Sequence, residues 1–226
     1  MALVTGGSRG IGRAIATALS AADAQIYITG RDAIVLERTA NEIGATPLAC
    51  DHCNPSEVEG VIGEIKRQNG KLDILINNAG AAHSLSEVDK LDLETWHKAI
   101  NLNLNGTFFT THYALPIMPR GSVIVNNLSP AAKHAFVGMS AYAAAKHGAL
   151  GFTNVLREEL RPRGIRVVAL LPGATDTEIW QQFWPNAPRE KMMRPETVAQ
   201  MVLQAVTLPP EASLDELVLM PSAGIL

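Results

Sequence analysis

Short runs of aliphatic and β-branched residues recur along this chain, and segments with helical spacing separate them. We expect the runs to form strands at 2–5, 25–29, 46–50, 72–77, 122–128, 165–171 and 216–220. We expect helices at 11–22, 33–43, 55–68, 93–115, 141–161 and 195–207. Such alternation favours βαβ units, whose parallel strands are covered by helices. The sequence therefore predicts a Rossmann-type α/β fold, a doubly wound parallel sheet of about seven strands with helices on both faces.

The composition is that of a globular protein with a large core. The chain has 226 residues, of which 47% are hydrophobic and 18% charged. It shows no repeat and no linker, so we expect residues 1–226 to form a single domain, with a substrate loop at about 174–195. The net charge of −3 argues against a nucleic-acid surface. The sequence has no apolar run of membrane-spanning length and no signal-peptide pattern, so we expect a cytoplasmic protein without membrane contact.

A glycine-rich turn, T-G-G-S-R-G-I-G at 5–12, follows the first expected strand and opens the first helix. Glycines allow a sharp turn and a close approach of the backbone to a pyrophosphate, and a helix N-terminus offers free N–H groups to an anion. The turn therefore indicates a dinucleotide site. The spacing differs from the common G-x-G-x-x-G, so an ordinary strand-to-helix turn is the alternative for this motif taken alone.

The charges near the second strand indicate which dinucleotide is bound. An NAD enzyme usually places a carboxylate at the end of this strand, where it accepts a hydrogen bond from the ribose 2′-OH. Here Gly30 stands at that place and Arg31 follows, while Arg9 projects from the glycine turn. Two guanidinium groups favour the 2′-phosphate of NADP. Asp32 is either a ribose partner or the N-cap of the next helix, and its position directly before an alanine-led helix favours the N-cap.

Tyr142 and Lys146 lie four residues apart in a segment with helical spacing, so we expect them on one helix face. A nearby ammonium favours a phenolate, so the pair can act as a tuned acid or base. The spacing alone is common on surface helices. Other polar residues strengthen the interpretation: the fourth strand ends in N-N-A-G at 77–80, several asparagines interrupt the helix at 101–105, and Ser129 closes the fifth strand.

Taken together, these motifs resemble those of the short-chain dehydrogenase/reductase family, and the resemblance runs from residue 2 to about residue 200. It rests on T-G-x-x-x-G-I-G, N-N-A-G, Asn103 before L-x-G, Ser129, Y-x-x-x-K at 142–146 and P-G-x-x-x-T at 172–177. The resemblance implies that Tyr142 is the general acid/base, that Lys146 lowers the tyrosine pKa and binds the nicotinamide ribose, and that Ser129 polarises the substrate carbonyl. It implies that Asn103 holds a helix distortion and a water of a proton relay.

The resemblance also implies a set of cofactor-binding residues. Asp51 is expected at the adenine amino group, Asn78 on the adenosine side, and Thr177 at the nicotinamide amide, while Arg9 and Arg31 match positions that mark NADP preference. The full expected set is Gly6, Ser8, Arg9, Gly10, Ile11, Gly12, Arg31, Asp51, Asn78, Ala79, Gly80, Tyr142, Lys146, Pro172, Gly173 and Thr177. We expect no metal site. The predicted cofactor is NADP(H), with NAD(H) as the alternative.

The sequence does not identify the substrate, because this family acts on chemically diverse carbonyls and alcohols. We expect Ser129, Tyr142, Trp180 and Trp184 to contact it. Phe183, Met192 and Met193 either complete an apolar lid with the tryptophans or pack the loop onto the core. His134, Phe136 and Met139 are further candidates for the substrate side. We therefore expect a moderately apolar ketone or a 3-oxoacyl compound.

Several alternatives stay open at this point. The chain could instead be an NAD-dependent secondary-alcohol dehydrogenase, or a catalytically silent cofactor-sensing protein, although such proteins typically lack the tyrosine or the lysine. We expect a homodimer through the helices at 93–115 and 141–161, or a homotetramer, which the end of the chain just after the last strand places in doubt. Cys50 and Cys53 are either a redox dithiol or a buried thiol beside a loop thiol, and the second reading is favoured.

Overall fold

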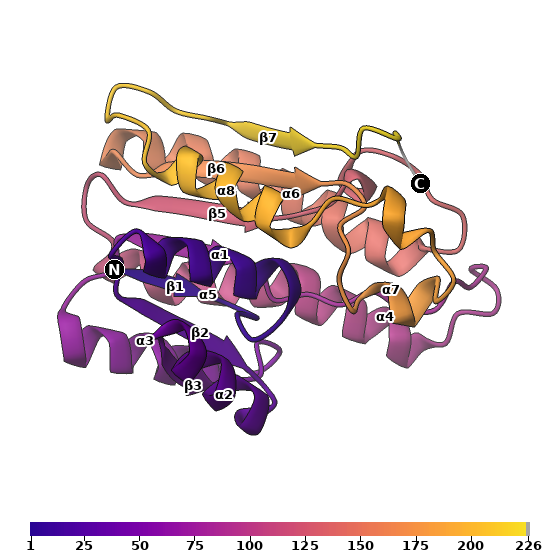
Figure 1. The fold of residues 1–226 in the computed structure, drawn as a ribbon, viewed down its shortest axis with the longest axis horizontal. Helices are drawn as coiled ribbons and strands as arrows, with labels where there is room; N and C mark the ends of the chain where they lie inside the picture. The colour runs from indigo at the N-terminus through magenta and orange to yellow at the C-terminus, as the bar shows by residue number, and fades with distance from the viewer. Residues whose placement is uncertain (225–226) are drawn as a thin grey trace.

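Seven parallel strands form the central sheet of this computed structural model, which describes residues 1–224, with Phe183 described by its backbone alone (Figure 1). The strands are β1 (Ala2–Val4), β2 (Ile26–Gly30), β3 (Thr46–Ala49), β4 (Ile74–Asn77), β5 (Val123–Asn127), β6 (Arg166–Pro172) and β7 (Glu216–Leu219). Their order is β3-β2-β1-β4-β5-β6-β7. In β1, Val4 pairs with Ile28 of β2 and with Ile76 of β4. The predicted Rossmann-type sheet is confirmed, and each expected strand is present.

Helices cover both faces of the sheet, because side chains of a strand point alternately to opposite sides. The α-helices are α1 (Gly10–Ala21), α2 (Ala33–Ile43), α3 (Pro55–Asn69), α4 (Leu93–Ile100), α5 (Gly106–Ala114), α6 (Ser140–Leu160), α7 (Trp180–Phe183) and α8 (Pro195–Val206). Val4 points into a core shared with α1, α2 and α8. Leu3 points into a second core shared with α3, α5 and α6. Within residues 1–224, each helix is too short or too polar to cross a lipid bilayer.

The helix expected at 93–115 is interrupted in its middle, at the asparagines where a distortion was expected. The structure has α4, then a π-helix η1 (Asn101–Asn105), then α5. The side chain of Asn103 explains part of the distortion, because its Nδ2 donates to the carbonyl oxygen of Ala99 at 3.0 Å and so competes for a helix acceptor. Such π segments are rare and often occur at functional sites.

A crevice is expected between β1 and β4, where the order in which strands are added to the sheet reverses. Strands β1 and β4 are neighbours, so the connections from β1 and from β4 lead to opposite sides of the sheet. A ligand site is expected outside the carboxyl ends of the strands at such a point. Figure 1 shows the strand arrowheads pointing toward the side of the molecule that carries α4 and α7.

Gly12 allows the first turn of α1 to lie against β4. A Cβ added at Gly12 would collide with Asn78 Nδ2 and with the carbonyl oxygen of Gly6, whereas one added at Gly63 on α3 would meet nothing within 4 Å. We predict that Gly12→Ala lowers the free energy of unfolding by about 1–3 kcal/mol through overpacking. Gly63→Ala should raise it by roughly 0.4–1 kcal/mol, because it lowers the entropy of the unfolded chain. Urea denaturation measures both, and an equal effect of the two substitutions would contradict the packing described.

Candidate active site

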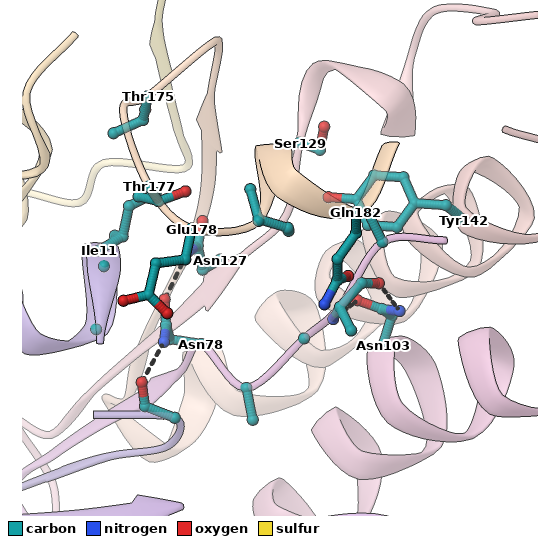
Figure 2. Close-up of a pocket in the computed structure, with 18 of the residues that line it drawn as sticks. Ile11, Asn78, Asn103, Asn127, Ser129, Tyr142, Thr175, Thr177, Glu178 and Gln182 are labelled. Atoms are coloured by element: carbon teal, nitrogen blue, oxygen red, sulfur yellow. Dashed lines mark hydrogen bonds between the residues drawn. The ribbon is translucent and has the colours of Figure 1, made fainter. Parts of the chain in front are cut away.

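A cavity of about 1200 Å³ opens at the carboxyl edge of the sheet. The expected cofactor-binding and catalytic residues and the four expected substrate contacts all line it: Gly6, Ser8, Arg9, Gly10, Ile11, Gly12, Arg31, Asp51, Asn78, Ala79, Gly80, Asn103, Ser129, Tyr142, Lys146, Pro172, Gly173, Thr177, Trp180 and Trp184. Figure 2 shows Ser129 and Tyr142 toward one end and Ile11 with Thr177 toward the other. Parallel strands bring these distant segments together, because all their carboxyl ends meet at one edge.

The amide of Asn78 holds the glycine turn in place. Its Nδ2 donates to the carbonyl oxygens of Thr5 at 2.9 Å and Gly6 at 3.2 Å. Its Oδ1 accepts from Asn127 Nδ2 at 2.8 Å, so the turn after β1 is connected to the ends of β4 and β5 (Figure 2). Gly6 has a φ of 61°, a conformation that glycine adopts without strain. The Asn78 side chain thus shapes the cavity wall.

The end of the cavity near β2 carries the predicted basic residues. Arg9 donates to Glu178 at 3.1 Å and to Asp32 at 3.5 Å, and all three side chains are largely exposed. Asp32 Oδ1 accepts from the backbone N–H of Val35 at 3.1 Å, so the N-cap interpretation is confirmed. A Cβ added at Gly30 would lie 3.2 Å from Ser8 Oγ. An acidic side chain at position 30 would therefore crowd the glycine turn.

The segment after β3 is held by polar contacts of Asp51 and His52. Asp51 Oδ1 accepts from the backbone N–H of Cys53 at 3.0 Å. His52 is buried between Thr29 at 2.7 Å and Thr110 at 3.1 Å, and burial lowers its pKa to about 4.

The two cysteines of this segment are held as thiols. Burial raises the pKa of the Cys50 thiol to about 12 and also raises that of Cys53, which disfavours the thiolate that redox exchange requires. Both are free, in keeping with a buried thiol beside a loop thiol.

Tyr142 and Lys146 lie on the buried face of α6, as their spacing predicts, with Lys146 Nζ 5.5 Å from the centre of the Tyr142 ring. Burial raises the Tyr142 pKa to about 12, and a hydrogen bond with Ser129 opposes that rise. This direction is opposite to the lowering expected from the ammonium. The reason is burial: Tyr142 is only 9% exposed, and desolvation disfavours the phenolate. Tyr142 is therefore a protonated phenol at neutral pH, poised to donate.

Lys146 is an ammonium buried beside the end of β5. Its Nζ donates to the carbonyl oxygen of Asn127 at 2.9 Å, and burial lowers its pKa to about 8. A proton can thus be held or released by this side chain close to neutral pH.

Asn103 lies in the π-helix and packs against the loop after β4. Its Nδ2 donates to the carbonyl oxygen of Ala81 at 2.9 Å, and its Oδ1 accepts from the Ala81 N–H at 3.3 Å. A Cβ added at Gly80 would lie 2.7 Å from Asn103 Oδ1 and 3.7 Å from Lys146 Nζ. The bare backbone of Gly80 therefore leaves room for the asparagine and the lysine side chains beside this loop. The predicted helix distortion at Asn103 is present.

The loop from residue 174 to 193 is fastened at its two ends. The backbones of Thr175 and Met193 form a parallel bridge, and Met193 N–H donates to Ala174 at 3.0 Å. An ion pair between Arg189 and Asp176 lies beside it. The interior of the loop holds two short helices, α7 and the 3₁₀-helix η5 (Arg189–Lys191). The loop is therefore a closed unit on the cavity wall, which we call the clasped loop.

The predicted lid is correct only in part. Trp180 is buried, and its Nε1 donates to the carbonyl oxygen of Thr175 at 2.8 Å, so it lines the cavity and also packs the loop. Trp184 is 40% exposed at the rim. Met192 and Met193 do not line the cavity in the described part of the chain, and Met193 packs against the core beside α1 and α8. The expectation for Phe183 concerns a side chain outside the described residues.

The outcome for the substrate-side candidates and for residues that we did not predict is also mixed. Phe136 and Met139 line the cavity, whereas His134 does not among residues 1–224. Asn127 and Glu178 line it without having been predicted. An asparagine so close to Ser129 at a strand end was an available signal for Asn127. Glu178 gave no signal beyond its place beside Thr177.

Comparison with known proteins agrees with this geometry. A family model described as short chain dehydrogenase matches residues 1–188. The chain belongs to the short-chain dehydrogenase family. It is 31% identical over 226 residues to an uncharacterized oxidoreductase of Staphylococcus aureus (strain USA300), a match that covers 98% of this chain and 96% of the relative.

Solved structures of this family have the same fold. A short chain dehydrogenase from Burkholderia cenocepacia in complex with NADP superposes with a TM-score of 0.90 at 31% identity, covering 98% of this chain and 96% of that one. A 3-ketoacyl-(acyl-carrier-protein) reductase from Brucella melitensis complexed with NADH superposes with a TM-score of 0.87 at 27% identity and the same coverage. This short-chain dehydrogenase is therefore an oxidoreductase by family.

The buried Lys146 gives a pH-dependent prediction for stability. Its pKa is about 8 in the folded chain against 10.5 for an exposed lysine, so between these values the unfolded chain binds more protons and wild-type stability rises with pH. Lys146→Met should therefore be more stable than wild type by about 1–3 kcal/mol at pH 7, and this advantage should shrink toward pH 10.5. Guanidinium denaturation across pH 7–10.5 measures it, with the exposed Lys66→Met as control. A difference that does not vary with pH would contradict a buried ammonium.

Proposed function

We propose that this chain is an NADPH-dependent carbonyl reductase in which Tyr142 donates the proton. One observation carries the proposal. A single cavity joins a glycine turn with two arginines at one end to Ser129 and the buried Tyr142 and Lys146 at the other. In this family a nicotinamide ring lying between these ends would face the phenol.

The residues present fit a nicotinamide dinucleotide. The α1 helix begins at Gly10 after an N-cap residue, Arg9, that makes no side-chain cap, so its first N–H groups are available to a pyrophosphate. A Cβ at Gly10 would lie 3.1 Å from Thr177, so the glycine turn and the clasped loop converge on this place. Asp51, Asn78 and Thr177 would hold the adenine, adenosine and nicotinamide ends. When bound, the reduced cofactor supplies a hydride.

The side chains of this chain manage the accompanying charge and proton. During reduction, negative charge grows on the carbonyl oxygen, and hydroxyl donors placed there stabilise it. Ser129 and Tyr142 are the two such donors. Because burial keeps Tyr142 protonated, its hydroxyl is ready to transfer its proton to that oxygen. Lys146 would hold the nicotinamide ribose, and Asn103 in the π-helix would support the path by which a proton returns to Tyr142.

The charges at the adenosine end support NADP(H) over NAD(H). Arg9 and Arg31 line this end, and Gly30 replaces the carboxylate that usually binds a ribose 2′-OH. Arg9 would exchange its contacts with Asp32 and Glu178 for the phosphate. Related structures were solved with either cofactor, NADP in the Burkholderia protein and NADH in the Brucella protein.

The substrate side of the cavity supports an apolar ketone. Its walls include Leu85, Phe136, Val137, Met139 and Trp184, together with the amides of Gln181 and Gln182. Among the described residues, the charged side chains on the cavity wall are those of the cofactor side and Lys146. An uncharged, moderately apolar ketone suits these walls, and a 3-oxoacyl compound is the second candidate, in line with the 3-ketoacyl reductase among the similar structures. A panel of carbonyl compounds assayed with NADPH would select between them.

Two further proposals concern the assembly and the alternatives. Exposed apolar side chains on α4, α5 and α6, namely Trp96, Phe108 and Val155, support a homodimer through these helices. An NAD-dependent alcohol dehydrogenase is the second candidate function, and the exposed Asp32 near the ribose end is the observation that favours it.

A cytoplasmic location stays a prediction.

Removing the proton donor tests the proposal directly. We predict that Tyr142→Phe lowers kcat for NADPH-dependent reduction by roughly 100-fold or more, while the dissociation constant of NADPH changes little. NADPH oxidation with the best ketone of the panel measures the rate, and quenching of protein fluorescence measures binding. Tyr113→Phe, on α5, is the matched control and should retain activity. Equal turnover by wild type and Tyr142→Phe would refute the assignment.

Removing the arginines tests the cofactor preference. We predict that Arg9→Ala and Arg31→Ala each weaken NADPH binding by about 10-fold, because each removes a charge-assisted contact with the 2′-phosphate. NADH binding should change much less. Arg38→Ala on α2 should alter neither, since its guanidinium reaches toward Glu42. If wild type binds NADH as tightly as NADPH, the preference is wrong.

A further inference from the structure

The helix that carries Tyr142 begins without a cap of its own. Its N-cap residue, Met139, makes no side-chain hydrogen bond to the first turn. The first backbone bond inside α6 is the one from Ala143 N–H to Met139 at 2.8 Å. The N–H groups of the preceding turn, including that of Tyr142, therefore need acceptors from outside the helix.

His83, in the loop after β4, supplies an acceptor at Tyr142 itself. The backbone N–H of Tyr142 donates to His83 Nε2 at 3.4 Å. The other ring nitrogen, Nδ1, lies 2.8 Å from the carbonyl oxygen of Ser84. A carbonyl can only accept, so Nδ1 carries the proton and Nε2 of the neutral ring is left with its lone pair. The two contacts are therefore consistent with one tautomer and with one direction for each hydrogen bond.

The loop that carries His83 is fixed at two other places. On one side, Asn103 of the π-helix makes two hydrogen bonds with Ala81. On the other side, Ser86 N–H donates to Gly138 at 3.0 Å, and Ser86 bridges to Met139 just before α6. His83 is 8% exposed between these attachments. The ring thus belongs to a continuous set of contacts from the π-helix to the start of α6.

We propose that His83 is a positioning residue. By accepting a hydrogen bond from the backbone N–H of Tyr142, it caps the first turn of α6 and sets the position of the Tyr142 phenol. The inference rests on the proposed role of Tyr142. The ring of Tyr142 packs in a small cluster with Ala82, Phe136 and Met139, all close to the same loop. A displaced first turn would therefore move the phenol relative to Ser129, and a shift of about 1 Å in a reacting group can cost about 100-fold in rate.

Substitutions that mimic one ring nitrogen at a time test this proposal. The amide of glutamine can place an acceptor where Nε2 lies, whereas the shorter amide of asparagine reaches only the place of Nδ1. We expect His83→Gln to retain kcat within about threefold, and His83→Asn and His83→Leu to lose about 10- to 100-fold. The dissociation constant of NADPH, measured by fluorescence, should stay within about twofold in all three, because the loss concerns the phenol.

Several outcomes would overturn the proposal. A kcat in His83→Asn and His83→Leu equal to that of wild type would do so, and so would a loss in His83→Gln as large as in His83→Leu. In the Tyr142→Phe background, His83→Leu should add no further loss; an additive loss would indicate a role apart from Tyr142. Full activity of Tyr142→Phe alone would instead refute the proposed function.

A measurement independent of turnover uses the wild-type protein. The ¹⁵N shifts of the His83 ring, assigned by comparison with His83→Gln, should show a protonated Nδ1 and a bare Nε2. The reverse tautomer would overturn the proposal even if the activities followed the expected pattern, since a protonated Nε2 cannot accept from Tyr142.

Discussion

The hydrogen bonds of Asn78 determine how the cavity is built. Its amide nitrogen is occupied by two carbonyls of the glycine turn, so its oxygen has to face Asn127, whose nitrogen must then face Asn78. One amide thereby fixes the orientation of the next and joins three strand ends. The same Asn127 accepts from Lys146 through its carbonyl oxygen. The site proposed for the cofactor and the buried Lys146 thus share one polar connection, and Gly12 leaves the space for it.

This arrangement buries polar groups that would be more stable in contact with water. Lys146 and Tyr142 are 5% and 9% exposed. Burial lowers the pKa of the lysine and raises that of the tyrosine, so that the neutral form of each side chain is favoured. For the tyrosine this displacement keeps a proton where the proposed reduction needs one. For the lysine it weakens the charge that a ribose or a phenolate would use. Function at this site therefore opposes stability, as is common where groups are desolvated for chemistry.

Features that depend on local periodicity could be predicted from the sequence. Strand runs, the capping role of Asp32 and the shared face of Tyr142 and Lys146 all follow from spacing over a few residues. The direction of the Tyr142 pKa shift could not be predicted, because it depends on how many atoms of other segments surround the ring. The pair between Arg9 and Glu178 joins residues 169 positions apart, and no local pattern reports such a contact. His83 was missed because its contact with Tyr142 also joins distant parts of the chain. The asparagines at 101–105 did indicate an irregular helix, and the structure shows that its form is a π-helix.

The clasped loop has a consequence for how this protein can change. Its ends are joined by backbone bonds at Thr175 and Met193, and these bonds do not depend on the side chains between them. The entropy of closing a loop also grows only slowly with its length. Residues between the ends, apart from Thr177 and the buried Trp180, can therefore be replaced, lengthened or shortened while the sheet and α6 stay as they are. In evolution or in engineering, this short stretch is the part of the cavity wall that can be exchanged, and its exchange would change the proposed substrate side.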